Sequence, residues 1–149
     1  MGIQTKRTIL IVEDDALIAM MEKLSLEEYG YTIITAITGE EAIEVFKNNT
    51  AIDLILMDID LGKGIDGPTA AIEILKVREI PVVFLSSHTE PEIVEKTEKI
   101  TSYGYVVKNS GITVLDASIK MAFKLFKAKQ ILQEHEQKQS SIYNTVGNA

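Results

Sequence analysis

The sequence predicts an α/β protein: a doubly wound, five-stranded parallel sheet of the (βα)5 type, covered by helices on both faces. Three observations predict it. Short β-rich runs alternate with helix-like stretches along the 149 residues, several runs are almost continuously aliphatic, and the helix-like stretches have readable ends. Continuous aliphatic runs are typical of strands buried on both faces, which belong in parallel sheets. Five such units in this length make one domain.

Five strands are expected, at residues 8–12, 32–36, 53–57, 82–86 and 104–107. The first, third and fourth contain the aliphatic runs Ile-Leu-Ile-Val, Leu-Ile-Leu-Met and Val-Val-Phe-Leu. Runs of this kind, bounded by polar residues, glycine or proline, are the strand signal.

The first two helices are expected between these strands. An apolar stripe should turn the first helix toward the sheet; it consists of Leu17, Met21 and Leu24. Gly30 ends that helix. Thr38 and Glu41 form a capping box that opens a second helix at residues 40–48.

Three further helices follow. Residues 67–78 form the third, with Pro68 in the first turn, where its missing N–H costs nothing. Thr89 and Glu92 form a second capping box, before a helix that ends near residue 101. The last helix begins near Thr113, and its expected buried residues are Leu115, Ile119, Ala122 and Phe126.

Two strand orders compete for this pattern, the flavodoxin-like order 2-1-3-4-5 and the Rossmann order. The Rossmann fold needs a glycine-rich G-x-G-x-x-G turn after the first strand to hold a pyrophosphate. Glu13, Asp14 and Asp15 stand there instead and would repel one. The sequence therefore predicts the flavodoxin-like order.

Composition excludes several classes of protein. Apolar residues make up 46% and charged residues 25% of the chain, which is ordinary globular usage. A net charge of -7 argues against direct nucleic-acid binding. The absence of cysteine excludes disulfides, Cys-ligated metals and thiol catalysis. No signal peptide and no apolar run of about 18 residues is present, so we expect a soluble, cytoplasmic protein without membrane insertion.

Acidic residues gather after two strands that the predicted order makes neighbours. Glu13 and Asp14 follow the first strand, and Asp58 and Asp60 stand at the end of the third. Ligands bind in this crevice of an open α/β sheet. Each acid alone is equally well explained as a loop residue or helix cap. Together they would repel one another, and Mg²⁺ bound by one or two carboxylates relieves that repulsion best.

A hydroxyl and an ammonium follow the next two strands. Ser86 ends the fourth, followed by Ser87, and Lys108 follows the fifth. Alone, the serines are ordinary helix caps and the lysine a side chain reaching water. Beside a carboxylate–metal cluster they are the groups that phosphoryl oxygens require.

These residues belong to four motifs, one at each of four strand ends. In chain order the motifs are Ile-Leu-Ile-Val-Glu13-Asp14, Leu-Ile-Leu-Met-Asp58, Pro-Val-Val-Phe-Leu-Ser86 and Gly-Tyr105-Val-Val-Lys108. In this ordered set the sequence resembles a CheY-like response-regulator receiver domain of two-component signal transduction. The resemblance covers about residues 7–128. It implies a phosphoprotein of the phosphorelay type, in which a sensor histidine kinase or phosphotransfer protein is the partner.

The resemblance also implies a role for each residue. Asp58 is the phosphoacceptor, which attacks a phosphohistidine of the partner. Asp14 and Asp58 bind Mg²⁺ directly, Glu13 binds it through water, and the backbone carbonyl of Asp60 is a further ligand. Such a domain assists its own phosphorylation and dephosphorylation and is not otherwise an enzyme.

Three more residues complete the implied switch. Lys108 pairs with Asp58 and then with the phosphoryl oxygens. Ser86 moves toward the phosphate, and Tyr105 rotates inward as the coupled aromatic residue. Asn109 stands where the family usually has proline, which favours a trans Lys108–Asn109 peptide. The loop after Asp58 lacks the usual Met-Pro and is one residue longer.

Residues 129–149 are expected to form a helical tail or linker after a receiver domain at 1–128, leading toward a downstream domain. A weak heptad has Leu125, Leu132, Gln139 and Val146 at one core position and Ala128, His135 and Ile142 at the other. A solvated helix explains this segment equally well. The last ten residues resemble the opening of a PAS sensor domain. Self-association is expected through the tail or through the face of the fourth helix, fifth strand and fifth helix.

Two other functions compete with a receiver. A haloacid-dehalogenase-like phosphatase also uses an aspartate nucleophile and Mg²⁺, and Asp58 and Asp60 mimic its D-x-D pair. That family has D-x-D on the first strand, however, and this sequence has no cap domain. The third hypothesis is an interaction module with a decayed site. His88 and His135 stand alone and are expected to be solvated.

Overall fold

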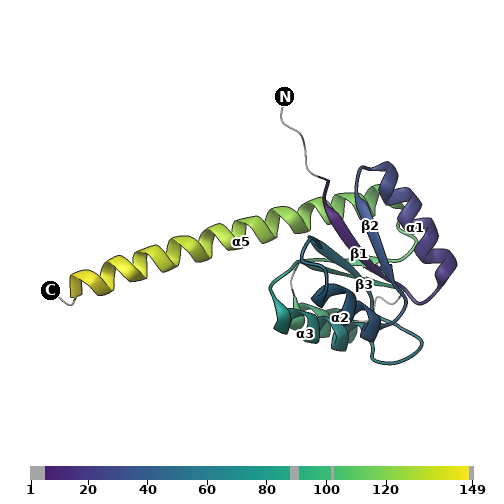
Figure 1. Cartoon of the computed structure of the whole chain (residues 1–149), viewed down its shortest axis with the longest axis horizontal. Coiled ribbons are helices and arrows are strands. Elements are labelled where there is room, and N and C mark those ends of the chain that lie inside the picture. Colours follow the sequence, from purple (N-terminus) through teal and green to yellow (C-terminus); the bar gives the residue numbers. More distant parts are fainter. Residues whose placement is uncertain (1–5, 88–90, 102, 148–149) are drawn as a thin grey trace.

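The computed structural model describes residues 6–87, 91–101 and 103–147, with the backbone alone for 138–147. Its centre is a five-stranded parallel sheet in the order β2-β1-β3-β4-β5 (Figure 1). The strands are β1 (Thr8–Val12), β2 (Thr32–Ala36), β3 (Leu54–Asp58), β4 (Val82–Ser86) and β5 (Tyr105–Val107). The predicted fold class and strand order are confirmed. β3 lies one residue later than expected, and β5 begins one residue later.

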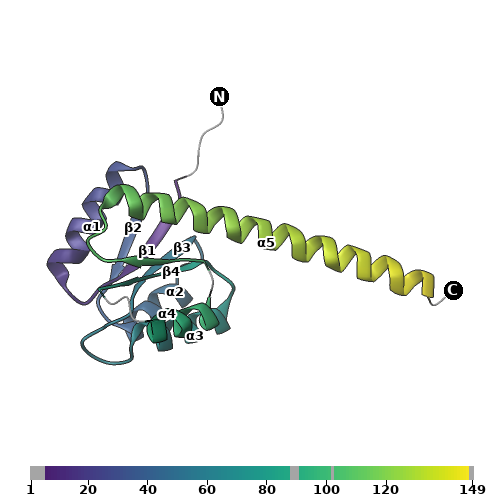
Figure 2. The same ribbon diagram turned by 180° about the vertical axis from the view of Figure 1, so that it is seen from behind.

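Five helices cover the sheet in two layers. They are α1 (Ala16–Glu28), α2 (Gly39–Lys47), α3 (Gly67–Val77), α4 (Pro91–Ile100) and α5 (Ile112–Gly147). α1 and α5 pack side by side on one face, whereas α2, α3 and α4 follow one another on the other face (Figures 1 and 2). The carboxyl ends of the strands are left open between these layers.

The aliphatic runs have the expected cause, burial on both faces of the sheet. In β1, Leu10 and Val12 enter the core beneath α2 and α3, while Ile9 and Ile11 enter the core beneath α1 and α5. β3 alternates in the same way, and every residue of both β3 and β4 is buried. Neither strand has a solvent-exposed face, so polar residues do not alternate with apolar ones along it.

Side chains that accept backbone N–H groups of the first turn mark the starts of α2 and α3. Thr38 Oγ1 accepts the Glu41 N–H at 3.0 Å, as the capping box predicts. The Glu41 carboxylate, however, accepts the N–H of Ile37 at 3.2 Å, one residue before the expected donor. Asp66, which was not predicted as a cap, accepts the Thr69 N–H at 2.8 Å and opens α3. The predicted cap Thr89 and the neighbouring His88 lie outside the described residues.

The predicted core stripe of α1 is wrong. Leu17, Met21 and Leu24 are 70%, 60% and 56% exposed, and the buried residues are Ala19 and Leu26. Apolar side chains surround this helix, so the sequence offers more than one apolar face. The small Ala19 lies on the face that packs, which leaves the larger side chains in solvent.

α5 continues as one helix far past the sheet (Figures 1 and 2). Leu115, Ile119 and Ala122 are buried as predicted. Phe126, which was also expected to be buried, is only half-buried, and its ring contacts that of Tyr103 with 5.6 Å between the centroids. Among the helices described, none has the length and apolarity required to cross a bilayer.

Candidate functional site

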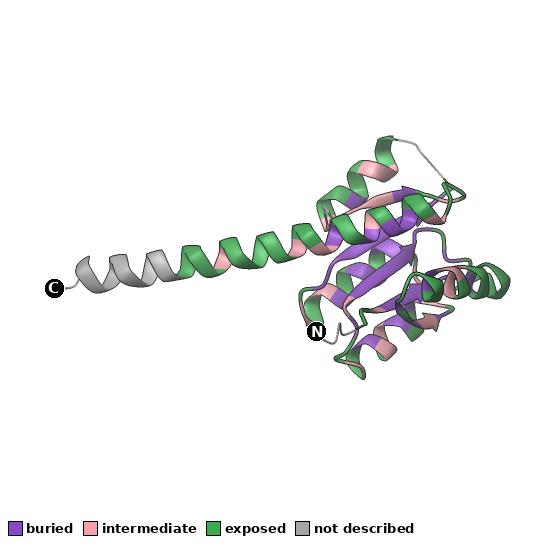
Figure 3. Cartoon of the chain, turned by 90° about the horizontal axis from the view of Figure 1, so that it is seen from above, coloured by how far each residue is buried: buried purple, intermediate pink, exposed green. Residues whose placement is uncertain are grey.

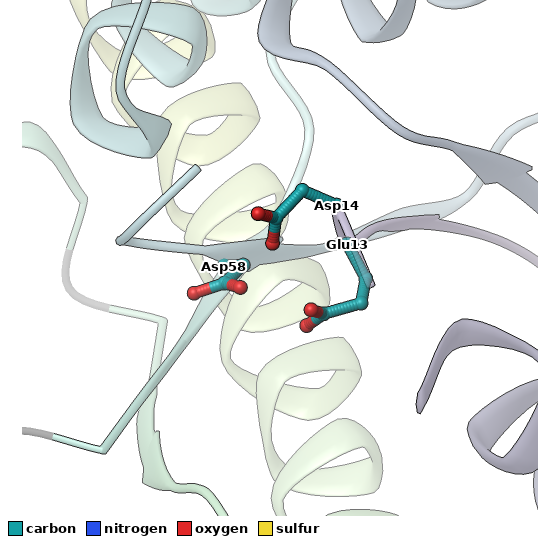
Figure 4. Close-up of side chains that lie close together, drawn as sticks. All are labelled: Glu13, Asp14 and Asp58. Atoms are coloured by element: carbon teal, nitrogen blue, oxygen red, sulfur yellow. The ribbon is translucent and has the colours of Figure 1, made fainter. Parts of the chain in front are cut away.

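Three carboxylates meet where β1 and β3 end. Glu13 follows β1 and Asp58 ends β3, and the two strands are paired in register through Val12 and Met57. Glu13 and Asp58 are each 1% exposed, whereas Asp14 is exposed to solvent. One oxygen from each of the three lies within 4.8 Å of the others (Figure 4). The structure therefore brings together three of the four acids that the sequence predicts at this site.

Lys108 lies between the two buried acids. Its Nζ is 2.7 Å from Asp58 Oδ2 and 3.1 Å from Glu13 Oε2. Its backbone N–H donates to the Ser86 carbonyl at 2.8 Å, which fixes the residue to the end of β4. The predicted pairing of Lys108 with Asp58 is present, and Glu13 is a second partner.

Burial and repulsion set the protonation of this cluster. Burial, reinforced by the negative charge of Asp58, raises the pKa of Glu13 to about 7. Burial alone would lower the pKa of Lys108, but hydrogen bonds to Asp58 and Glu13 outweigh it and raise the pKa. Lys108 thus stays charged and contacts two of the three carboxyl groups, those of Glu13 and Asp58.

Backbone N–H groups orient the acids. The Asp60 N–H donates to Asp58 Oδ1 at 3.0 Å, and the Asp15 N–H donates to Glu13 Oε1 at 3.2 Å. Asp14 Oδ2 accepts the N–H of Gly62 at 3.1 Å, from the loop after β3. Asp60 is exposed to solvent, and its backbone N–H contacts Asp58.

Glycine is required where α3 begins. A Cβ at Gly67 would overlap the carbonyl oxygen of Asp58, and the Gly67 N–H donates to the Ile59 carbonyl at 3.1 Å. Ile59 in turn donates its N–H to Leu85 at 3.0 Å. These contacts hold the chain after Asp58 against both α3 and β4.

Ser86 and Tyr105 lie on neighbouring strands. Ser86 is fully buried at the end of β4, and Tyr105 is half-buried at the start of β5. Tyr105 pairs with Phe84 and Val107 pairs with Ser86, so Ser86 and Tyr105 project to the same face of the sheet. Tyr105 packs against the core on the side of α2, α3 and α4.

Asn109 changes the turn after Lys108. The Lys108–Asn109 peptide is trans, as its sequence favours, and Asn109 has a φ of 69°. Asparagine tolerates this left-handed conformation better than most residues with a side chain.

Two residues near the site were missed by sequence reasoning. Glu40 on α2 accepts the Ile65 N–H at 2.9 Å and holds the loop after β3. Glu22 on α1 lines a cavity of about 310 Å³ together with Lys108. Burial raises the pKa of Glu22 to about 7 despite the attraction of Lys108, and its Oε2 has no hydrogen-bond partner within the described chain. Both acids lie on helices, and their positions in the sequence do not distinguish them from glutamates that face solvent.

The donor set fits a hard divalent cation. Glu13, Asp14 and Asp58 offer oxygen ligands only, and part of this acidic charge is not balanced by Lys108. Mg²⁺ prefers such ligands and keeps several waters, which the exposed side of Asp14 leaves room for. His135 is exposed on α5, as predicted, and lies outside this group.

Comparisons with known proteins agree on one family. The family model of the response regulator receiver domain matches residues 9–120. The transcriptional regulatory protein PdtaR of Mycobacterium tuberculosis is 35% identical over 122 residues, which are 81% of this chain and 58% of that protein. This chain therefore spans little more than half the length of that relative.

Solved structures give the same result. The N-terminal domain of a response regulator/sensory box/GGDEF 3-domain protein from Carboxydothermus hydrogenoformans is 46% identical, with a TM-score of 0.76. The match covers 83% of this chain and 98% of that one. A two-component response regulator from Clostridium difficile is 29% identical, with a TM-score of 0.74, over 80% of this chain and 97% of that one.

Proposed function

The chain belongs to the response regulator receiver domain family, and on that premise we propose that it is a signalling module switched by phosphorylation of Asp58. The phosphoryl donor is a phosphohistidine on a sensor histidine kinase or phosphotransfer protein. One observation supports this most strongly: Lys108 bridges the buried Asp58 and Glu13 beside Asp14, at the open end of the sheet.

Asp58 is the nucleophile of this reaction. Its carboxylate oxygen forms a bond to phosphorus as the bond from phosphorus to the donor imidazole nitrogen breaks, and the imidazole keeps the electron pair. A carboxylate nucleophile carries no proton that a base would have to remove, and Lys108 Nζ contacts Asp58 Oδ2 at 2.7 Å. Lys108 Nζ then pairs with the phosphoryl oxygens, which require positioning and charge neutralisation more than covalent chemistry.

Asp14 and Asp58 would hold Mg²⁺ directly, Glu13 would hold it through water, and the Asp60 carbonyl would be a further ligand. Bound there, the ion would neutralise charge on the phosphoryl oxygens during transfer. The close approach of the three carboxylates supports this assignment, since one oxygen of each lies within 4.8 Å of the others and Lys108 is the cation that contacts Glu13 and Asp58.

The response to phosphorylation is carried by Ser86 and Tyr105. We propose that the Ser86 hydroxyl moves toward the phosphoryl group and that Tyr105 turns inward into the space this frees. Their common face of the sheet supports the coupling. The surface of α4, β5 and α5 then changes. A side chain such as Tyr105 with two alternative positions can be shifted from one to the other by a local change of charge.

The exposed apolar face of α1 offers a contact for the phosphodonor. Leu17, Met21 and Leu24 form this face, and α1 begins three residues after Glu13, beside the opening to Asp58. A donor that reaches Asp58 can cover this face at the same time. An exposed apolar patch next to a reactive group is typical of a partner contact.

The output lies beyond the receiver domain. The Carboxydothermus hydrogenoformans relative is one part of a protein with a sensory box and a GGDEF domain. We propose that α5 likewise leads from a cytoplasmic receiver domain toward a downstream domain. The state of Asp58 would reach that domain through α5.

Intact-mass spectrometry tests the proposal directly. Incubation with acetyl phosphate and Mg²⁺ should add one phosphoryl group, which should be absent from Asp58→Asn and absent without Mg²⁺. Asp14→Ala should abolish the addition, and Lys108→Ala should retain part of it. Asp60→Asn is the matched control and should remain competent. Phosphate on Ser86, or steady turnover of a generic aryl phosphate as a haloacid-dehalogenase-like phosphatase would show, would contradict the assignment.

A further inference from the structure

α5 carries two apolar stripes. One consists of Leu115, Ile119 and Ala122, which are buried against the sheet. The other begins with Val114 and Met121, which are 47% and 55% exposed although they lie within the receiver domain. Successive residues of a helix are about 100° apart, so the second stripe lies on the side of α5 that the sheet does not cover.

The second stripe continues past the sheet. Leu125, Ala128 and Leu132 follow Met121 at steps of four, three and four residues, and Leu125 and Leu132 are 46% and 56% exposed. From Val114 to Leu132 the stripe is about 27 Å long at 1.5 Å per residue. Figure 3 shows α5 extending away from the domain with exposed residues along it. Alternating steps of three and four residues are the pattern of a coiled-coil seam.

We propose that this stripe packs against the same stripe of a second copy of the chain, in a parallel, in-register, two-stranded coiled coil that begins inside the receiver domain. A narrow stripe with this spacing fits the apolar seam of another long helix. The covering helix must also run beside both the domain and its projecting part. The α5 of a second copy does so by twofold symmetry, because the same surface is used on both chains.

The sequence of the whole helix favours the parallel direction. In a parallel pair Leu125 meets Leu125 and Leu132 meets Leu132, while His135 and Gln139 each meet only themselves. An antiparallel pair overlapping from Val114 to Val146 would set Leu125 against His135 and Met121 against Gln139. The parallel pair places the receivers side by side and brings both carboxyl ends together. This inference does not depend on phosphorylation.

Cysteine cross-linking tests the direction, because the natural chain has no cysteine. Leu125→Cys and Leu132→Cys, introduced singly into the full chain, should each give a disulfide-linked dimer on mild oxidation. Lys127→Cys and Gln130→Cys lie on the same helix off the seam and should give little. An antiparallel pair brings at most one of the two seam positions to its own copy. Cross-linking at only one of them, or equally at the control positions, would overturn the proposal.

Sedimentation tests the association itself. The wild-type chain should have twice the monomer mass, and Leu125→Lys and Leu132→Lys should weaken self-association at least about tenfold. Gln130→Lys adds the same charge off the seam and should sediment like the wild type. Both leucines are exposed, so an unchanged melting temperature will show that the domain stays folded. A wild-type chain that is monomeric at every concentration would refute the dimer, and a trimer would refute its two-stranded form. Because Asp58 phosphorylation is measured separately, neither result bears on the proposed function.

Discussion

The carboxylate cluster of Glu13, Asp14 and Asp58 and the outer face of α1 lie close together, and each shows the opposite of the usual pattern of burial. At the site, Glu13 and Asp58 are each 1% exposed, although carboxylates almost always face water. On α1, Leu17, Met21 and Leu24 are more than half exposed, although such residues usually form the core. The molecule therefore buries charge and exposes apolar surface at neighbouring places.

Both departures have a physical reason. Buried acids are tolerable only when they are paired, and Lys108 supplies that partner at 2.7 and 3.1 Å. The α1 face has no partner among the described residues, and it borders the opening through which the proposed donor would reach Asp58. The carboxylate cluster and the α1 face therefore call for different explanations: the buried acids are explained by their pairing with Lys108, and the exposed apolar face by the proposed contact with a donor.

Removing the pairing cation should have the largest effect. Lys108→Gln leaves Glu13 and Asp58 buried without their partner, which costs about 3–5 kcal/mol of folding free energy for a broken buried pair. Urea unfolding at pH 8 measures it. Lys76→Gln, which breaks the exposed Lys76–Glu73 pair, is the control and should cost at most about 0.5 kcal/mol. If both variants lost an equally small free energy of unfolding, the contacts of Lys108 with Glu13 and Asp58 would contribute no more to stability than an exposed ion pair does.

The buried acid of α1 should give a pH dependence. The pKa of Glu22 is raised from 4.5 to about 7 in the folded chain, so the folded state binds more protons than the unfolded state between these values. Stability must then fall as the pH rises through this window, by up to about 3 kcal/mol from Glu22 at 1.36 kcal/mol per unit.

Glu22→Gln should remove that part of the decline, leaving the variant more stable than the wild type at pH 8 and little changed near pH 4.5. Glu28→Gln, on the exposed side of the same helix, should leave the profile unaltered. Melting curves across pH 4.5–8 decide this, and parallel profiles for the wild type and Glu22→Gln would contradict the assignment.

Relief of repulsion should also stabilise the site. Mg²⁺ should raise the melting temperature, by the equivalent of about 2.7 kcal/mol at a hundredfold excess over Kd. Asp58→Asn should raise it without Mg²⁺, because the Asp58 charge acts on Glu13. Calorimetry with and without Mg²⁺ measures both. A midpoint that moves in neither case would show that the three carboxylates do not act as one cluster.

The α1 face should show the smallest change in stability. Serine at Leu17, Met21 and Leu24 together should alter the unfolding free energy by no more than about 0.5 kcal/mol per site, because these side chains bury little. The same variant should still be phosphorylated by acetyl phosphate. It should react more slowly with a phosphohistidine-bearing protein, and equal rates with that protein would remove α1 from the donor contact.

Much of the fold was predictable because strand signals are local. Aliphatic runs identified the first, third and fourth strands, and shorter β-rich runs identified the second and fifth. The convergence of the strand ends in the predicted order placed Glu13, Asp14 and Asp58 at one site. Asp53 was assigned to β3, but its side chain accepts the Thr8 N–H at 2.8 Å at the strand's start. The sequence alone does not distinguish an aspartate that precedes a strand from one that belongs to it.

The errors arose where packing decides. The orientation of α1 could not be predicted, because apolar residues surround the helix and the spacing alone does not show that Ala19 and Leu26 are the ones that pack. The contribution of Glu22 was hidden for the same reason, since burial of a helical acid depends on its neighbours. The loop after β3 is held by Gly62 and Glu40, whose contacts join residues 48 and 25 positions apart.

We propose that Asp58 alone carries the phosphoryl group. Borohydride reduces an acyl phosphate of aspartate to homoserine, so treatment of the Mg²⁺ and acetyl phosphate product, followed by peptide mass spectrometry, identifies the modified position. We expect homoserine at residue 58, with Asp14, Asp60 and Ser86 unmodified. Homoserine at Asp14 or Asp60, or a stable phosphate on Ser86 with Asp58 intact, would contradict it.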